Sequence, residues 1–136
     1  MLGRLVKVLI VEDNPGDVVL VREALKQAQV AFELTVQDDG ESMLHMVETL
    51  EQQGGPFPDV VLLDLNLPRV SGLELLARMR KSATWSAVPV VIASSAGAPS
   101  DRLAAAKLGI SDYFRKPADL EEFMEIGAIV RRVVGN

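Results

Sequence analysis

The stretch that most constrains the fold runs from Pro58 to Pro68 and contains four consecutive apolar residues, Val60 to Leu63, followed at once by Asp64. A short apolar run between prolines is typical of a β-strand buried on both faces, as the inner strands of parallel sheets are. Burial accounts for the apolar residues but leaves Asp64 unexplained. An aspartate in this position usually makes a turn or caps a helix, so a functional role requires other polar residues to converge on it.

Similar apolar runs alternate with segments of helical periodicity along the whole chain. The pattern predicts strands at residues 6–11, 32–37, 60–63, 88–93 and 111–114. It predicts helices at residues 17–28, from 40 to about 54, from 71 past 79, 100–108 and 119–134. Residues 32–37 alternate between apolar and polar, which favours an edge strand. The order of strands and helices is typical of one α/β domain with a doubly wound parallel sheet, spanning residues 1–136 with five strands and five helices.

The composition excludes several classes of function. There are 19 acidic and 14 basic residues, and the net charge of -5 does not favour binding to nucleic acid or anionic lipid. The chain has no cysteine and one histidine, which excludes disulfides, thiol catalysis and thiolate zinc sites. The apolar run near the N-terminus is interrupted by Lys7 and is too short for a signal or membrane segment. We therefore expect a cytoplasmic protein that contacts neither nucleic acid nor a membrane.

Five polar residues are predicted to meet at one edge of the sheet, because ligands of open parallel sheets bind beyond the carboxyl ends of the strands. They are Glu12, Asp13, Asp64, Ser94 and Lys116. Three carboxylates in a partly desolvated site repel one another, so they take up protons or hold a cation. Mg²⁺ commonly uses carboxylates together with phosphate oxygens, and lysine and serine bind phosphoryl oxygens. The pattern predicts a phosphoryl-binding site in which a carboxylate can act as a nucleophile.

At these residues the chain resembles the response-regulator receiver domains of two-component signalling. The resemblance covers essentially the whole chain and is carried by Val11-Glu12-Asp13, Leu62-Leu63-Asp64-Leu65-Asn66-Leu67-Pro68, Ser94-Ser95-Ala96, Tyr113 and Lys116-Pro117. It implies a flavodoxin-like fold whose strands follow the order 2-1-3-4-5. Because no effector domain follows Val134 in the sequence, we expect a stand-alone response regulator that acts through its own surface or passes the phosphoryl group onward.

The resemblance implies a role for each acidic residue of the site. Asp64 would be the phosphoacceptor that takes the phosphoryl group from a phosphohistidine of a sensor histidine kinase. Mg²⁺ would be held by Glu12, Asp13 and Asp64, with the main-chain carbonyl of Asn66 as a further ligand.

The resemblance also assigns the residues around the acids. Lys116 would pair with the phosphoryl group, and Ser94 would bond it and act with Tyr113 as a switch. Asn66 and Ala96 would flank the path of the attacking water and so set the lifetime of the phosphoryl group. The bond between Lys116 and the following proline is expected to be cis, as it commonly is in receivers.

Two positions differ from the commonest receiver pattern, although both variants occur within the family. Many receivers have aspartate where this chain has Glu12, and threonine is commoner than serine at position 94. The turn from Glu12 to Asp17 and the loop before Pro58 resemble those of single-domain regulators that partner phytochrome-type kinases. A bacteriophytochrome is therefore a candidate for the kinase.

The last predicted helix carries more apolar residues than a core-facing stripe needs. Leu120, Phe123, Gly127, Val130 and Val134 share one face. Counting about 100° per residue, Ile126, Ile129 and Val133 extend this face to roughly 220°. The simplest explanation is that a terminal helix tolerates exposed apolar residues. The alternative is that Ile126, Ile129 and Val133 form a partner surface, most simply for a homodimer.

Two other functions remain as alternatives to phosphoryl acceptance. A pseudo-receiver would keep the fold as a binding module without being phosphorylated, but every residue expected for phosphorylation is present. A phosphohydrolase with Asp64 as nucleophile would want a second acid two residues later, where this chain has Asn66. We therefore expect self-phosphorylation and self-dephosphorylation chemistry but no enzymatic turnover.

Overall fold

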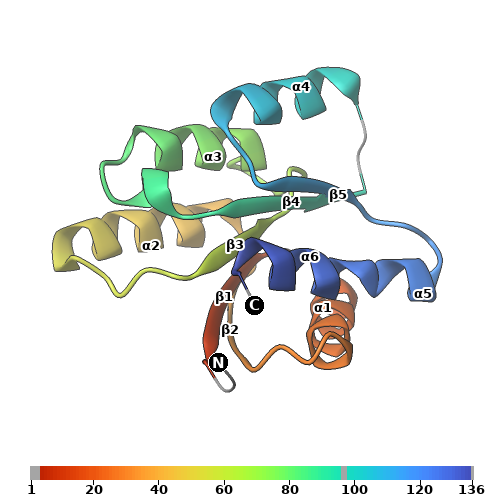
Figure 1. Cartoon of the computed structure of the whole chain (residues 1–136). Helices are drawn as coiled ribbons and strands as arrows, with labels where there is room; N and C mark the ends of the chain where they lie inside the picture. Colours follow the sequence, from red (N-terminus) through yellow and green to blue (C-terminus); the bar gives the residue numbers. More distant parts are fainter. Residues whose placement is uncertain (1–3, 96–97, 136) are drawn as a thin grey trace.

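The computed structural model describes residues 4–95 and 98–135 and consists of a parallel sheet between two layers of helices (Figure 1). The five strands are β1 (Val6–Val11), β2 (Phe32–Gln37), β3 (Val60–Leu63), β4 (Val90–Ser94) and β5 (Asp112–Arg115). Their order in the sheet is β2-β1-β3-β4-β5, and every neighbouring pair is parallel. The predicted flavodoxin-like fold is confirmed.

The helices follow the strands in the predicted alternation. They are α1 (Pro15–Gln27), α2 (Gly40–Gln53), α3 (Gly72–Lys81), the 3-10 helix η1 (Trp85–Ala87), α4 (Pro99–Leu108), α5 (Leu120–Phe123) and α6 (Glu125–Val133). The α5 and α6 segments replace the single last helix expected, and Met124 joins them with helical dihedral angles of φ −63° and ψ −17°. Within the described ranges, no helix has the length and apolarity needed to span a membrane.

Polar residues at the helix starts fix where several helices begin. The Asn14 side chain caps α1 by accepting from the amides of Gly16 and Asp17. A capping box begins α3, with Ser71 Oγ accepting from the Glu74 amide at 3.2 Å and the Glu74 carboxylate accepting from the Ser71 amide. These caps satisfy amides that have no partner inside a helix. They therefore define the loops that follow β1 and β3.

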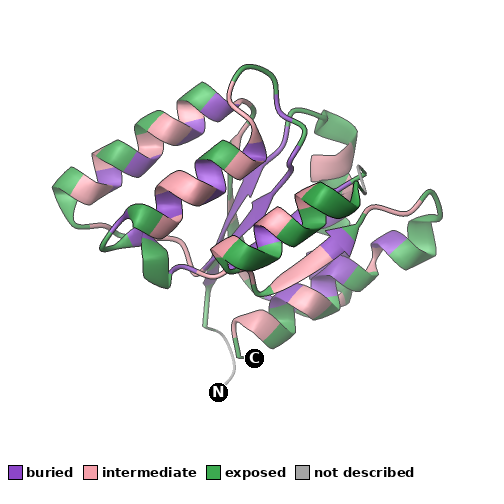
Figure 2. Ribbon diagram, turned by 90° about the horizontal axis from the view of Figure 1, so that it is seen from above, coloured by how far each residue is buried: buried purple, intermediate pink, exposed green. Residues whose placement is uncertain are grey.

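The sheet separates two apolar cores. Helices α2, α3 and α4 cover one face, and α1, α5 and α6 cover the other (Figure 1). All four residues of β3 are 0% exposed, with Val61 and Leu63 in the first core and Val60 and Leu62 in the second. Figure 2 shows buried strands at the centre of the molecule. β2 lies at the edge of the sheet, as the alternation of its residues predicted.

The last helix lies deeper in the core than the sequence suggested. Ile126 is 0% exposed and belongs to the core beneath α1, so its assignment to an exposed partner surface is wrong. Ile129 and Val133 are half-buried against the same core. The cause is Gly127, where an added Cβ would lie 2.2 Å from the carbonyl oxygen of Ala24. This close approach to α1 buries a wider arc of α6 than an ordinary helix contact would.

Candidate functional site

The strand register brings the predicted polar residues together at the carboxyl edge of the sheet. Val11 pairs with Leu63, and the Asp64 amide donates to the Val11 carbonyl at 3.1 Å, so Asp64 and Glu12 follow the ends of neighbouring strands. On the other side, the Lys116 amide donates to the Ser94 carbonyl at 2.9 Å. Backbone pairing thus places four of the five predicted residues, Glu12, Asp64, Ser94 and Lys116, at the carboxyl ends of the strands.

The Asp64 carboxylate is buried and bonded on both oxygens. The residue is 5% exposed, and its Oδ1 accepts from the Asn66 amide at 2.9 Å and from Ser94 Oγ at 3.1 Å. Its Oδ2 accepts from Lys116 Nζ at 3.2 Å. The Asn66 contact is the local turn that a lone aspartate usually makes. The contacts with Ser94 and Lys116 come from the ends of β4 and β5, so turn formation alone does not explain the residue.

The Lys116 ammonium lies among three carboxylates. Its side chain is 8% exposed and donates to Glu12 Oε1, to Asp17 Oδ2 at 2.8 Å and to Asp64 Oδ2 at 3.2 Å. Burial lowers the pKa of Lys116, but the bonds to Asp17 and Glu12 and the nearby negative charges more than offset this and raise it. The ammonium therefore stays charged. The bond between Lys116 and Pro117 is trans, so the expected cis bond is wrong, and the cis bond among the described residues joins Gly55 and Pro56.

Glu12 is the most deeply buried acid of the site. It is 3% exposed, its Oε1 accepts from Lys116, and its Oε2 accepts from the Asn14 amide at 3.2 Å. Burial raises the pKa of Glu12 to about 7, although the bond to Lys116 acts in the opposite direction. Near neutral pH this carboxyl group therefore changes protonation easily.

Three of the acids form a cluster that suits a divalent cation. Carboxylate oxygens of Glu12, Asp13 and Asp64 lie within 4.8 Å of one another. Oxygens bound to one octahedral Mg²⁺ at about 2.0–2.1 Å lie at most about 4.2 Å apart, so the three side chains would have to move closer together to hold the ion. Asp13 is exposed, whereas Glu12 and Asp64 are buried, so the site is open to solvent on one side. The donor set is the hard oxygen type that Mg²⁺ prefers.

Comparison with known proteins assigns the chain to a family. Residues 8–127 match the family model described as the response regulator receiver domain. The chain belongs to this family. The receiver also resembles the response regulator Rcp1 of Synechocystis sp., with 32% identity over 120 residues, which cover 88% of this chain and 82% of Rcp1.

Solved structures of phytochrome response regulators share the receiver's fold. The phosphorylated cyanobacterial phytochrome response regulator RcpA has a TM-score of 0.83 and 30% identity, covering 95% of this chain and 93% of RcpA. The Mn²⁺-bound form of Rcp1 has a TM-score of 0.78 and 29% identity, covering 92% and 91% of the two chains. The bacteriophytochrome response regulator AtBRR has a TM-score of 0.74 and 33% identity, covering 98% and 94%. This receiver is thus similar to regulators of the phytochrome class.

The remaining residues predicted for the receiver site have different outcomes. Tyr113 is half-buried on β5, and the Arg102 guanidinium lies 4.8 Å from the centre of its ring. Burial raises the pKa of the Tyr113 hydroxyl. The switch role of Tyr113 and Ser94 and the metal role of the Asn66 carbonyl stay predictions. Ala96, predicted to tune dephosphorylation, lies outside the described residues.

Sequence reasoning missed one residue of the receiver site. Asp17 lies in the first turn of α1 and pairs with Lys116 through the contact at 2.8 Å. Its side chain is 22% exposed. The signal was present, because Asp17 ends the acidic turn that begins at Glu12, but nothing in the spacing indicated that a helical residue would face the lysine.

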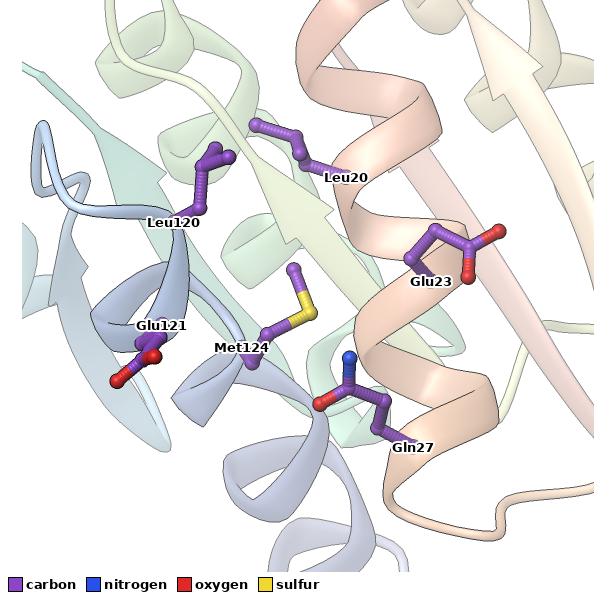
Figure 3. Close-up of a pocket in the computed structure, with 6 residues that line it drawn as sticks. All are labelled: Leu20, Glu23, Gln27, Leu120, Glu121 and Met124. Carbon is purple, nitrogen blue, oxygen red and sulfur yellow. The ribbon is translucent and has the colours of Figure 1, made fainter.

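A groove of about 530 Å³ lies between α1 and the segment of α5 that ends at Met124. It is lined by Leu20, Glu23, Gln27, Leu120, Glu121 and Met124. Figure 3 shows Leu20 reaching from α1 toward Leu120 and Met124. The lining contains none of the residues of the carboxylate cluster, so the groove is a separate surface feature.

Proposed function

We propose that this receiver accepts a phosphoryl group on Asp64 from the phosphohistidine of a sensor histidine kinase, in a reaction that requires Mg²⁺. One observation carries the proposal: the buried Asp64 carboxylate contacts both the Lys116 ammonium and the Ser94 hydroxyl, and it shares a cluster with two further acids. A nucleophilic oxygen, a positive charge and a hydrogen-bond donor thus meet at one point. This is the set of groups that phosphoryl transfer to a carboxylate needs.

The transfer step follows from this placement. An Asp64 oxygen forms a bond to phosphorus while the bond between phosphorus and the imidazole nitrogen of the kinase breaks, and the electron pair of that bond stays on the imidazole. Lys116 and Ser94 already contact opposite oxygens of Asp64, so each can turn to an oxygen of the arriving phosphoryl group. Mg²⁺, held by Glu12, Asp13 and Asp64, would supply charge neutralisation for the phosphoryl oxygens.

The chain's own residues favour an acceptor over a hydrolase. The residue two positions after Asp64 is Asn66, whose amide N–H bonds Asp64 and whose side chain is exposed and cannot act as an acid. The position from which a second acid would protonate the leaving group of a phosphomonoester is thus not occupied by an acid. We infer that the receiver carries out its own phosphorylation and dephosphorylation without acting as a general phosphatase. A pseudo-receiver is disfavoured because Asp64, Lys116 and the acidic cluster are all in place.

The partner that we propose is a histidine kinase of the bacteriophytochrome type. The support is the similarity to RcpA and AtBRR, which are phytochrome and bacteriophytochrome response regulators. A kinase that signals inside the cell would place the receiver in the cytoplasm. A homodimer through the last helix stays a prediction that concerns Ile129 and Val133 alone, because Ile126 is buried.

The proposal is tested by incubating the receiver with acetyl phosphate and Mg²⁺ and following the mass of the intact protein. We expect one phosphoryl adduct in the wild type, none when a chelator replaces Mg²⁺, and none in Asp64→Asn, whose amide is not nucleophilic. Asparagine has nearly the same size as aspartate, so we expect Asp64→Asn to fold. A cooperative unfolding curve of this variant is the control. Repeated turnover of a phosphomonoester would support the hydrolase instead, and an unmodified wild type would support the pseudo-receiver.

A further inference from the structure

The contact between Asp17 and Lys116 joins two distant parts of the receiver. Asp17 lies in the first turn of α1, and Lys116 directly follows β5, which is at the far side of the sheet from β2. Their contact at 2.8 Å is shorter than the one at 3.2 Å between Lys116 and Asp64. Lys116 thus lies closer to Asp17, a residue that the family resemblance did not assign, than to the proposed phosphoacceptor.

A simpler explanation for Asp17 is its position in the helix. Acidic residues are favourable in the first turn of any helix, because they face the positive end of the helix dipole. A residue that served only this purpose would remain solvated. Asp17 is instead 22% exposed and faces an ammonium that is 8% exposed. The helix start therefore accounts for an acid at this position but not for its pairing.

The local structure aims Asp17 at the lysine before any ligand arrives. Pro15 opens α1, and the Asn14 side chain accepts from the Gly16 amide at 2.9 Å and from the Asp17 amide at 3.4 Å. This cap fixes the backbone of the first turn. Asp17 is therefore held by α1, independently of the strand ends that carry the rest of the site.

Asp17 differs from the other two partners of Lys116 in its relation to the cation. Among the described residues, the cluster that could hold an ion contains Glu12, Asp13 and Asp64 but not Asp17. A divalent cation would therefore compete with Lys116 for the oxygens of Glu12 and Asp64. The Asp17 carboxylate remains available to the ammonium, because it lies outside that cluster.

We propose that Asp17 is a positioning residue, which holds the Lys116 ammonium beside Asp64 when Glu12 and Asp64 turn their oxygens to a divalent cation. The inference rests on the proposed phosphoryl acceptance, because positioning matters only if Lys116 must meet a phosphoryl oxygen. The Lys116 ammonium has three N–H groups, and one of them donates to Asp17. Of the other two, the one that donates to Asp64 can turn to the phosphoryl group while the bond to Asp17 keeps the lysine in the site. Asp17 acts through Lys116 and does not itself contact the reacting atoms.

The first test compares the rates of phosphorylation by acetyl phosphate, with Mg²⁺ raised until the rate no longer depends on it. Asp17→Ala is expected to lower the rate constant about tenfold or more, because a displaced catalytic group commonly costs this much. Asp17→Glu restores a carboxylate on a longer side chain and is expected to recover most of the rate. Glu41→Ala is the matched control, since Glu41 is an exposed acid in the first turn of α2 that pairs with Arg69. An unchanged rate in Asp17→Ala would overturn the proposal, because Lys116 would then need no help from Asp17. A faster rate would also overturn it, because the negative charge would then only repel the phosphodonor.

The second test does not depend on phosphorylation. A double-mutant cycle of Asp17→Ala and Lys116→Met measures their coupling from urea unfolding at saturating Mg²⁺. We expect the two changes to be non-additive, since each removes the same pair. Additive effects in the presence of Mg²⁺ would show that Lys116 leaves Asp17 when the cation binds, and the proposal would fail. If the wild type took up no phosphoryl group while the cycle remained non-additive, the proposed function would be wrong and the pairing correct.

Discussion

Replacing Gly72 by alanine should damage the site through the backbone of Asp64. Gly72 is the first residue of α3, and an added Cβ would lie 2.3 Å from the Asp64 carbonyl oxygen and 2.6 Å from the Leu65 Cα. Both neighbours are main-chain atoms, so no side chain can rotate away. The methyl group can be accommodated only if the loop after β3 moves away from α3.

The expected size of the effect follows from two opposing contributions. Alanine is a better helix former than glycine by about 0.5–1 kcal/mol, so helix propensity alone predicts that the variant is more stable. Overpacking a rigid contact costs about 1–3 kcal/mol. The close approach therefore reverses the sign, and we expect a net loss of about 1–2 kcal/mol in the free energy of unfolding. Because the displaced carbonyl belongs to Asp64, affinity for Mg²⁺ should also fall, by about tenfold, as it does when groups that orient metal ligands are changed.

Gly127→Ala provides the matched control for this prediction. Its Cβ would meet the Ala24 carbonyl oxygen at 2.2 Å, an equally close contact, but between α6 and α1 and away from the carboxylate cluster. Urea unfolding should show a loss of stability in both variants, and calorimetric titration of the folded proteins with Mg²⁺ should show weaker binding in Gly72→Ala alone. A Gly72→Ala variant as stable as the wild type would refute the reasoning from the close contact. Equal weakening of Mg²⁺ binding in both variants would refute the local link to Asp64.

Two further predictions concern buried polar groups. Burial raises the pKa of Glu12 from its usual 4.5 to about 7 in the folded chain, so the stability that its protonation contributes is complete below the lower value and is lost as pH rises through the higher one. The loss amounts to about 3 kcal/mol at most. Urea unfolding with a chelator at pH 5 and pH 8 should show this decrease in the free energy of unfolding of the wild type. An equal decrease between the two pH values in Glu12→Gln would contradict the prediction. Trp85 donates its indole N–H to the Val47 carbonyl at 3.0 Å and packs edge-on against Phe57 at 5.4 Å between ring centres. Trp85→Phe should therefore lose about 1–3 kcal/mol in urea unfolding without changing the rate of phosphoryl uptake, and a change of less than 0.5 kcal/mol, the usual range of surface substitutions, would contradict it.

The sheet and the main part of the site could be predicted from the sequence because both depend on simple periodic signals. The apolar runs gave the strands, and the residues directly after them were placed at one edge by the geometry of parallel sheets. For Asp64 and Glu12 this placement is a matter of backbone register, since Val11 pairs with Leu63. No side-chain packing had to be known, so residues adjacent to a strand end were predicted correctly.

The sequence was less informative where distances between helices decide the outcome. The wide apolar arc of the last helix indicated an exposed surface for Ile126, but that inference assumed an ordinary separation between helices. Because Gly127 has no side chain, α6 can approach α1 until the Gly127 backbone contacts the Ala24 carbonyl. This contact buries Ile126. Asp17 was missed for a related reason. Its pairing with Lys116 depends on how α1 sits against the end of β5, which no local pattern encodes.

The balance of charge explains why the site and the fold are linked. Glu12, Asp17 and Asp64 surround a single ammonium, and Asp13 adds a further carboxylate at the open side. Buried strands hold two of these acids in place, so repulsion cannot be relieved by moving them apart. It is relieved by protonation, which the raised pKa of Glu12 reflects, or by a cation. A ligand that binds only the folded chain stabilises it, so the same rigidity that suits Asp64 to its proposed role as phosphoryl acceptor makes the stability of the receiver depend on what occupies its site.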